Sequence, residues 1–155
     1  MSRLFISAFL ASIAAGISDV FVAAALSRSP PGRVLQIIAS GLLGEASYTR
    51  GSASMALGLG LQIAMSFVIA LIYNIAFSYV AGIRGSPLMF GALYGVVIFV
   101  VMNFVVVPLS RAHTKPHWDL EAVIAMLIVM VLFAEIISLI ATAFGQRAEP
   151  RNILG

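Results

Sequence analysis

Four long runs of apolar residues constrain the fold of this chain more than any other feature. They cover residues 4–26, 55–81, 88–108 and 120–144. Each run exceeds about 20 residues, the length at which an α-helix crosses a hydrocarbon core of about 30 Å. Backbone amides in lipid must bond within their own segment, and the alternating polarity of barrel strands is missing. The sequence therefore predicts an all-α fold, a four-helix transmembrane bundle forming one integral membrane domain over residues 1–155.

Composition supports lipid as the solvent of these runs. Hydrophobic residues make up 61% of the chain and charged residues 10%, whereas soluble domains have about 45–50% and about 25%. Nine Lys and Arg residues give a net charge of +3, but they are scattered between the apolar runs. No basic cluster is dense enough to follow a phosphate backbone. We therefore expect the lipid bilayer as a partner and no nucleic acid.

The segments between the runs predict how the helices are joined. In the first gap, Pro30 and Pro31 begin a short apolar segment, residues 30–44, that is too short to cross the membrane. We expect an interfacial helix there, on the membrane or against the bundle, with a re-entrant segment as the alternative. Residues 45–54 could extend the second transmembrane helix. Ser86 and Pro87 suit a helix start, so the second and third transmembrane helices are predicted to form an antiparallel hairpin.

The first run and the orientation of the chain leave alternatives open. Arg3 and the small residues 23–25 also fit a signal peptide, although the length of the run and Asp19 within it argue against one. An even number of helices places both termini on one face, here named side A, with side B opposite. Basic residues do not decide the orientation, because Arg3, Arg84, Arg147 and Arg151 lie on side A and Arg28, Arg33, Arg50, Arg111 and Lys115 on side B. We expect the termini in the cytoplasm of a bacterial cytoplasmic (inner) membrane.

Five polar residues inside the apolar runs are the candidate functional residues. A rise of about 1.5 Å per residue sorts them into two layers by depth. The layer nearer side B holds Asp19, Gln62 and Asn103, and the layer nearer side A holds Asn74 and Glu135. An acid left alone in lipid would be costly, so each is expected to have polar neighbours. Ser138 and Thr142 share a helix face with Glu135, so this face should point inward. Tyr73 and Tyr79 could donate hydrogen bonds near side A.

Two interpretations of these layers stay open. The polar groups could be hydrogen-bonded contacts that hold the helices in register. Alternatively, Asp19 and Glu135 could carry protons or cations through the membrane. Their separation in depth, roughly 12 Å at the helical rise, favours the first interpretation. Small residues at helical spacing, among them the GxxxG pair Gly91 and Gly95, predict close helix packing and possible self-association.

Signatures of catalysis and of metal binding are missing from the sequence. No nucleophile elbow, phosphate-binding loop, zinc-protease or dinucleotide motif occurs. His113 and His117 lie in the third gap beside Pro116, without the acids or cysteines of a zinc site. The seven methionines are scattered along the sequence, which does not predict a copper site. We expect no catalytic residues, no metal and no cofactor, and hence no enzyme.

Three short segments resemble uncharacterised bacterial four-helix inner-membrane proteins, loosely of the YagU-like type. They are residues 15–19, residues 33–44, and residues 87–95 with Met102, Asn103 and 108–110. The resemblance concerns layout and short strings over most of the chain. It implies membrane location and fold, and it implies no activity. Members often carry a histidine early in the second helix, where this chain has Gln62.

Together these observations predict a small integral membrane protein that serves as a structural or accessory component. Its expected partners are the bilayer, a second copy of the chain or another membrane protein. The alternative function is a small transporter or proton-coupled carrier that uses Asp19 and Glu135. A membrane-embedded enzyme would need polar groups gathered at one depth, and the two predicted layers argue against it.

Overall fold

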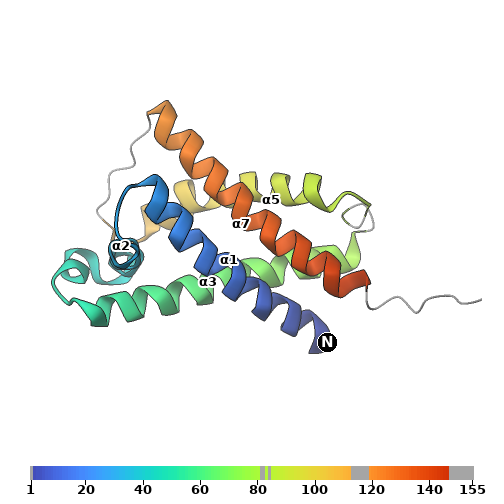
Figure 1. The fold of residues 1–155 in the computed structure, drawn as a ribbon, viewed down its shortest axis with the longest axis horizontal. Coiled ribbons are helices and arrows are strands. Elements are labelled where there is room, and N and C mark those ends of the chain that lie inside the picture. Colours follow the sequence, from blue (N-terminus) through green and yellow to red (C-terminus); the bar gives the residue numbers. More distant parts are fainter. Residues whose placement is uncertain (1, 81–82, 84, 113–118, 147–155) are drawn as a thin grey trace, which may run out of the picture.

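The chain folds into helices throughout the residues that can be described. The computed structural model describes residues 2–80, 83, 85–112 and 119–146, and no strand occurs among them (Figure 1). The elements are α1 (Ser2–Leu26), α2 (Pro31–Leu43), the 3₁₀-helix η1 (Gly44–Tyr48), α3 (Ser52–Tyr79), α5 (Pro87–Val101), the π-helix η2 (Met102–Val106), α6 (Val107–Leu109) and α7 (Leu120–Gln146).

Four of the described helices are long and apolar enough to cross a membrane. They cover Arg3–Leu26, Ser52–Tyr79, Pro87–Leu109 and Leu120–Phe144, the third being the continuous run of α5, η2 and α6. The predicted runs 4–26, 55–81, 88–108 and 120–144 agree with these bounds to within a few residues. The all-α prediction and the number of membrane-length helices are therefore confirmed for the described residues.

The long helices pack in an order that differs from their order in the sequence. α3 packs against α1, α1 against α7, and α7 against α5. The first turns of α1 lie at the same end as the last turns of α7, and α2 lies at the opposite end (Figure 1). We keep the name side A for the first end and side B for the end with α2.

The predicted hairpin of the second and third transmembrane helices is antiparallel, but its helices do not pack along their length. An apolar groove of about 490 Å³ lies between α3 and α5, lined by residues such as Val68, Ile72, Val97 and Val101. One hydrogen bond crosses between the two helices, from the Tyr94 hydroxyl to the Ile69 carbonyl oxygen, at 2.8 Å. Helices that are neighbours in sequence are thus held mainly through α1 and α7.

On α1, small side chains are buried against the neighbouring helices and large apolar ones lie on the outside. Ala8, Ala11 and Ser12 of α1 are fully buried, whereas Phe9 is 53% exposed on the same helix. A water-soluble core would show the opposite order, because burial of large apolar side chains drives its folding. In lipid, helices associate through close backbone packing instead. The distribution therefore agrees with four helices that face lipid.

Glycines set the closest approaches between helices. A Cβ atom at Gly95 would lie 2.6 Å from Val131 Cα, and one at Gly91 would lie 2.8 Å from Glu135 Oε2. The GxxxG pair is therefore covered by α7 within the same chain. This pair therefore serves packing within one chain, and self-association through other small-residue faces stays a prediction.

The α2 region joins α1 to α3 and packs on both. α1 ends in a Schellman motif, in which Ser29 N–H bonds the Ala24 carbonyl and Arg28 N–H bonds the Ala25 carbonyl. Arg28 holds the left-handed position, at φ 51°, that glycine usually takes. The backbone of α2 then meets α3 where Leu35 O lies against Gly58, a contact that leaves no space for a Cβ atom.

The segment after α2 corrects one prediction. Of residues 45–54, which could extend the second transmembrane helix, only the last three do so, because α3 begins at Ser52. Gly44–Tyr48 forms a 3₁₀-helix instead. Gly44 and Gly51 both have positive φ, at 60° and 55°, and they break the helical path on either side of that turn. The guanidinium of Arg33 lies 4.0 Å from the ring centroid of Tyr48 and ties α2 to this segment.

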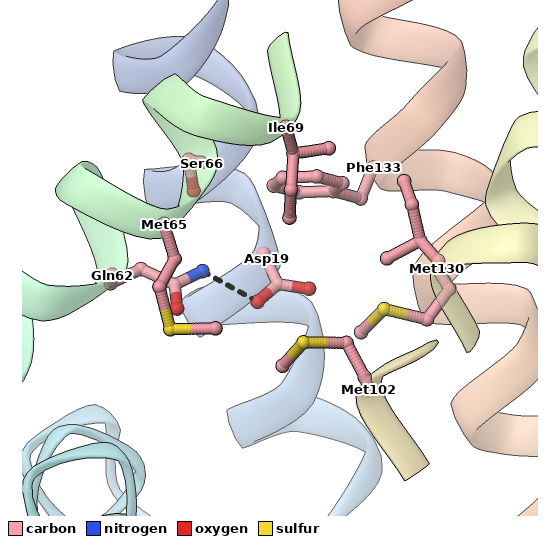
Figure 2. Close-up of a pocket in the computed structure, with 9 residues that line it drawn as sticks. Asp19, Gln62, Met65, Ser66, Ile69, Met102, Met130 and Phe133 are labelled. Carbon is pink, nitrogen blue, oxygen red and sulfur yellow. Dashed lines mark hydrogen bonds between the residues drawn. The ribbon is translucent and has the colours of Figure 1, made fainter. Parts of the chain in front are cut away.

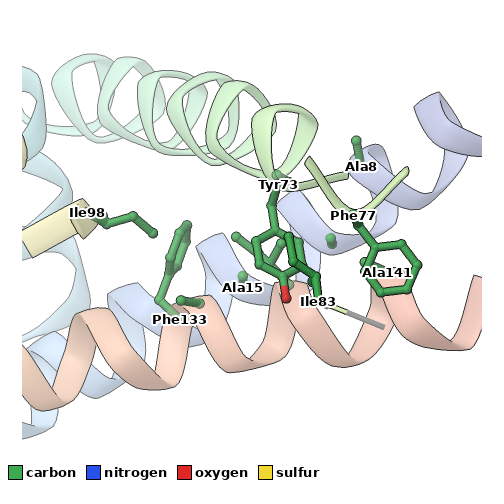
Figure 3. Close-up of a cluster of buried hydrophobic side chains, with 12 residues drawn as sticks. Ala8, Ala15, Tyr73, Phe77, Ile83, Ile98, Phe133 and Ala141 are labelled. Atoms are coloured by element: carbon green, nitrogen blue, oxygen red, sulfur yellow. The ribbon is translucent and has the colours of Figure 1, made fainter. Parts of the chain in front are cut away.

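The apolar core gathers on side A. Its buried members come from α1, α3, α5 and α7, with Ile83 between α3 and α5 (Figure 3). Tyr73 and Phe77 of α3 and Phe133 of α7 are its large members, and alanines of α1 and α7 fill the space around them. This closed core ends near Phe133 and Ile98, and the polar site described next begins there.

Candidate functional site

Asp19 is the acid that the structure places in a polar environment between helices. Its Oδ2 accepts a hydrogen bond of 2.7 Å from Gln62 Nε2 on α3, and the same amide nitrogen lies 3.3 Å from Gly16 O as a second acceptor. Asp19 Oδ1 is buried and has no hydrogen-bond partner in the described part of the chain. Gln62 thus orients the carboxyl group and leaves one oxygen free.

A small cavity adjoins this free oxygen. Its volume is about 30 Å³, which is enough for one or two water molecules or a single ion. The residues that line it come from all four long helices (Figure 2) and are Asp19, Gln62, Met65, Ser66, Ile69, Ile98, Met102, Met130 and Phe133. Met65, Met102 and Met130 are the three sulfur-bearing side chains of this lining, and Figure 2 shows them directed toward the same space as Asp19.

A groove toward side B shares two lining residues with this cavity. The groove, of about 350 Å³, runs between α1 and α7, and Asp19 and Met130 line both it and the cavity. Its other lining residues include Leu26 and Ser27 at the end of α1 and Ala122 near the start of α7. Toward side A, the apolar core closes the space between the same helices. Asp19 is therefore approached from one side.

Met102 owes its position to an irregular turn of helix. The π-helix η2 begins at Met102, whose carbonyl oxygen accepts the hydrogen bond of the Val107 amide five residues later. Pro108 follows, and a proline in this position has no amide hydrogen and crowds the carbonyl four residues earlier, that of Phe104. The wider turn accommodates the proline. Such π-turns occur frequently at functional sites.

The other polar candidates lie elsewhere. Asn103 Nδ2 bonds the Phe99 carbonyl of its own helix at 2.9 Å, so the third member of the predicted side-B layer does not join Asp19 and Gln62. Asn74 Nδ2 likewise bonds the Ala70 carbonyl of its own helix at 2.8 Å. The predicted pairing of Asn74 with Glu135 is therefore not made, and each amide satisfies a carbonyl of its own helix.

Glu135 lies between α7 and α5 and does not line the Asp19 cavity. Its Oε2 is buried against Gly91 and has no hydrogen-bond partner among the described residues. The predicted inward face of α7 is present, because Ser138 is fully buried and Thr142 bonds its carbonyl oxygen at 2.8 Å. The two acids thus face different parts of the structure and do not line one common path.

A hydrogen-bonded link of three residues lies near Glu135, and the sequence predicted only part of it. The Tyr73 hydroxyl donates to Ser138 Oγ at 2.7 Å, and Ser138 Oγ donates to the Pro87 carbonyl at 2.7 Å. Tyr73 was expected to donate a hydrogen bond here, but the role of Pro87 at the start of α5 was not foreseen. Tyr79, the other expected donor, is 85% exposed. The link joins α3, α7 and α5 on side A.

The three methionines at Asp19 were not identified from the sequence, although a signal existed. At a helical rise of about 1.5 Å, Met65, Met102 and Met130 lie roughly 3 to 6 Å from the middle of their helices toward side B. Asp19 lies at nearly the same depth. Methionines that are far apart in the sequence can therefore lie at the same depth along the helices.

Classical metal ligands do not gather in the described part of the chain. No group of three or more His, Cys, Asp or Glu side chains is found there. His113 and His117, which were interpreted as loop residues, lie outside the described residues.

Comparisons with known proteins add no relative. No family model, no curated protein and no solved structure matches this chain. The function must therefore be inferred from the chemistry of the site itself.

Proposed function

We propose that this protein is a small cation carrier of the bacterial cytoplasmic membrane and that Asp19 is the anionic group that binds the cation. In this proposal the four long helices form a transmembrane bundle and α2 lies at the side-B interface. The observation that carries the proposal is the buried Oδ1 of Asp19, which has no partner among the described residues, on a side chain that lines both a small cavity and a groove toward side B.

The cost of burying this acid supports a binding role. A carboxyl group at membrane depth is retained at a free-energy cost and commonly marks an ion or substrate path. If Asp19 served only to hold helices together, both of its oxygens would be expected to have donors, because an unmet buried acceptor is destabilising. Gln62 supplies one donor to Oδ2, and Oδ1 has no donor among the described residues. A proton or another cation would satisfy it.

One-sided access agrees with a carrier rather than a channel. The groove reaches Asp19 from side B, and the alanine-rich core closes side A. Carriers need a site that is open to one side at a time, with access alternating between the two sides. A rocking motion of α1 against α7 would open the other side. Glu135, packed against Gly91, lies outside this route.

A structural or accessory function is the second candidate, and one observation favours it. Hydrogen bonds between side chains or backbone of different helices join α1 to α3 at Gln62, α3 to α7 at Tyr73, and α5 to α3 at Tyr94. Such bonds hold transmembrane helices in register. In that case Asp19 and Gln62 would be part of the same set of links, and loss of the charge would affect stability alone.

Proteoliposomes that contain a trapped pH-sensitive dye distinguish the two functions. K⁺, Na⁺ and Ag⁺ are added outside in separate runs, and the proton movement that each causes is measured. We expect at least one cation to drive proton movement through the wild-type protein. Asp19→Asn keeps the size of the side chain but removes the charge, so this movement should be lost while the protein stays folded.

Glu135→Gln is the matched control, because it neutralises another acid of the long helices that does not line the cavity. It should transport like the wild type. Equal rates in wild-type and Asp19→Asn vesicles with all three cations would refute the carrier and leave the structural function.

A further inference from the structure

Three thioether groups and one carboxyl group meet at the Asp19 cavity, each from a different long helix. Asp19 comes from α1, Met65 from α3, Met102 from the start of η2, and Met130 from α7. From this arrangement we infer that the cavity binds a soft monovalent metal cation of the Cu⁺ class. The inference deepens the proposed function, since it names the chemical class of the cation.

The size of the cavity selects an ion over an organic ligand. Its volume of about 30 Å³ is close to that of one or two water molecules, whereas sites for small organic ligands occupy about 300–1,000 Å³. The adjoining groove, at about 350 Å³, is large enough for a hydrated ion to travel. An ion would therefore lose its water on passing from the groove into the cavity.

The charge of the site selects a monovalent ion. Asp19 is the one formally charged side chain that lines the cavity, and the thioethers are neutral. One positive charge on the metal would balance the carboxylate, whereas a divalent ion would leave a net charge in the membrane interior. An uncompensated charge at that depth is costly.

The ligand atoms select a soft ion. Thioether sulfur favours Cu⁺ over ions such as Na⁺ and K⁺, which prefer oxygen. Thioethers bind no proton near neutral pH, so they remain available as metal ligands across the physiological pH range. Asp19 Oδ1 has no donor of its own, and Gln62 fixes the other oxygen. A metal bound there would therefore receive oxygen from Asp19 and sulfur from the methionines.

Methionine also fills irregular gaps between helices because it is flexible, and this is the simpler explanation that the experiment must exclude. Two observations favour binding over filling. The three sulfur-bearing side chains line the same cavity as the carboxyl group (Figure 2), and they leave that cavity unfilled. The π-turn at Met102 adds an irregularity of a kind that is frequent at functional sites.

Silver binding to the purified full-length protein in detergent tests the inference, because Ag⁺ is a soft monovalent ion that needs no reductant. Isothermal titration should give one tight site per chain, and X-ray absorption of the bound silver should show sulfur neighbours. Met65→Leu, Met102→Leu and Met130→Leu keep the size and remove the sulfur. Each should weaken binding by about tenfold or more.

Met55→Leu and Met89→Leu are the matched controls. Met55 lies against Gly32 near the start of α3, and Met89 is 62% exposed on α5, so both should bind silver like the wild type. Equal affinity in all five variants, or silver with only oxygen and nitrogen neighbours, would overturn the inference. The X-ray absorption measurement is made on the wild-type protein, so its result stands even where a variant folds poorly.

The silver-binding test of the metal site and the proteoliposome test of the carrier have distinguishable outcomes. Silver bound by the three methionines without Asp19-dependent proton movement would uphold the metal site and refute the carrier. Asp19-dependent proton movement with Na⁺ or K⁺, together with no specific silver binding, would uphold the carrier and overturn the soft-metal site.

Discussion

On side A, the long helices meet through alanine, serine and glycine with aromatic side chains between them, whereas on side B the same helices meet through methionine and the Asp19–Gln62 pair. The side-A half holds the closed core around Tyr73 and Phe133. The side-B half holds a cavity and a groove. The same pair of helices, α1 and α7, thus forms a dry contact at one end and an accessible one at the other.

The difference follows from side-chain shape. Alanine and glycine bring backbones together and leave little space, so the contact excludes water and is rigid. Methionine is long, unbranched and adaptable, so it spans a gap without closing it. A membrane protein can therefore place a binding site in one half of its helices and its main source of stability in the other.

The labelling of single cysteines along α7 by a water-soluble reagent should show the largest contrast between the side-A and side-B halves. The chain has no cysteine, so single cysteines report their own surroundings. Ala125 lines the groove, and Ala134 is fully buried in the core. We expect a membrane-impermeant maleimide to label Ala125→Cys nearly completely and Ala134→Cys hardly at all. Ile128→Cys, on an exposed apolar position that lipid would cover, should also stay unlabelled. Equal labelling of the three would contradict the comparison.

The tight glycine contact of α5 with α7 should respond strongly to one added methyl group. In Gly95→Ala the new Cβ would meet the backbone of Val131 at 2.6 Å, and overpacking of this kind costs about 1–3 kcal/mol. Unfolding by SDS in mixed micelles, followed by circular dichroism, measures the loss. Gly60→Ala is the control, because nothing lies within 4 Å of its Cβ. A loss as large in Gly60→Ala would mean that close packing is not the cause.

The hydrogen-bonded link on side A should have a smaller effect. Ser138→Ala removes the acceptor of the Tyr73 hydroxyl and the donor to Pro87 O. We expect a loss of about 1 kcal/mol in the same unfolding measurement, since interhelical hydrogen bonds in membranes are modest. Adding Tyr73→Phe should cost little more, because the hydroxyl has already lost its partner. Fully additive losses would indicate that the two side chains act independently.

The turn after α1 should give the smallest effect, and in the stabilising direction. Arg28 takes a left-handed conformation, at φ 51°, which costs a side chain roughly 1 kcal/mol relative to glycine. Glycine also gives the unfolded chain more conformational freedom, which opposes this gain. Arg28→Gly should therefore raise the free energy of unfolding by about 0.5 kcal/mol or less. Ser29→Gly, at the neighbouring residue without positive φ, should give no gain. A gain of similar size in Ser29→Gly would point to general loop flexibility instead.

Several parts of the structure were predictable from local patterns. The apolar runs predicted the four membrane-length helices, because the length needed to cross lipid is visible in the sequence. Pro31 and Pro87 correctly marked the starts of α2 and α5, since proline suits the first helical turn. Depth along the helices also predicted the contact of Asp19 with Gln62, because a regular rise of about 1.5 Å converts residue number into height.

Other parts required the arrangement of helices around one another. Depth alone placed Asn103 beside Asp19 and Asn74 beside Glu135, but it contains no information on which way each helix is turned. Rotation decided that Met102 rather than Asn103 faces the cavity, and that Tyr73 rather than Asn74 reaches α7. The 3₁₀-turn at Gly44–Tyr48 likewise depends on how α2 packs against α3.

The sequence by itself determined that four helices are long and apolar enough to cross a membrane, and at what height each polar residue lies along them. Only the tertiary structure decided that α1 and α7 stand between α3 and α5, that the GxxxG pair is covered within the chain, and that three methionines meet at Asp19. The physical reason is that length and hydrophobicity are properties of each segment alone. Neighbours and facing directions come from the fit of one helix surface against another.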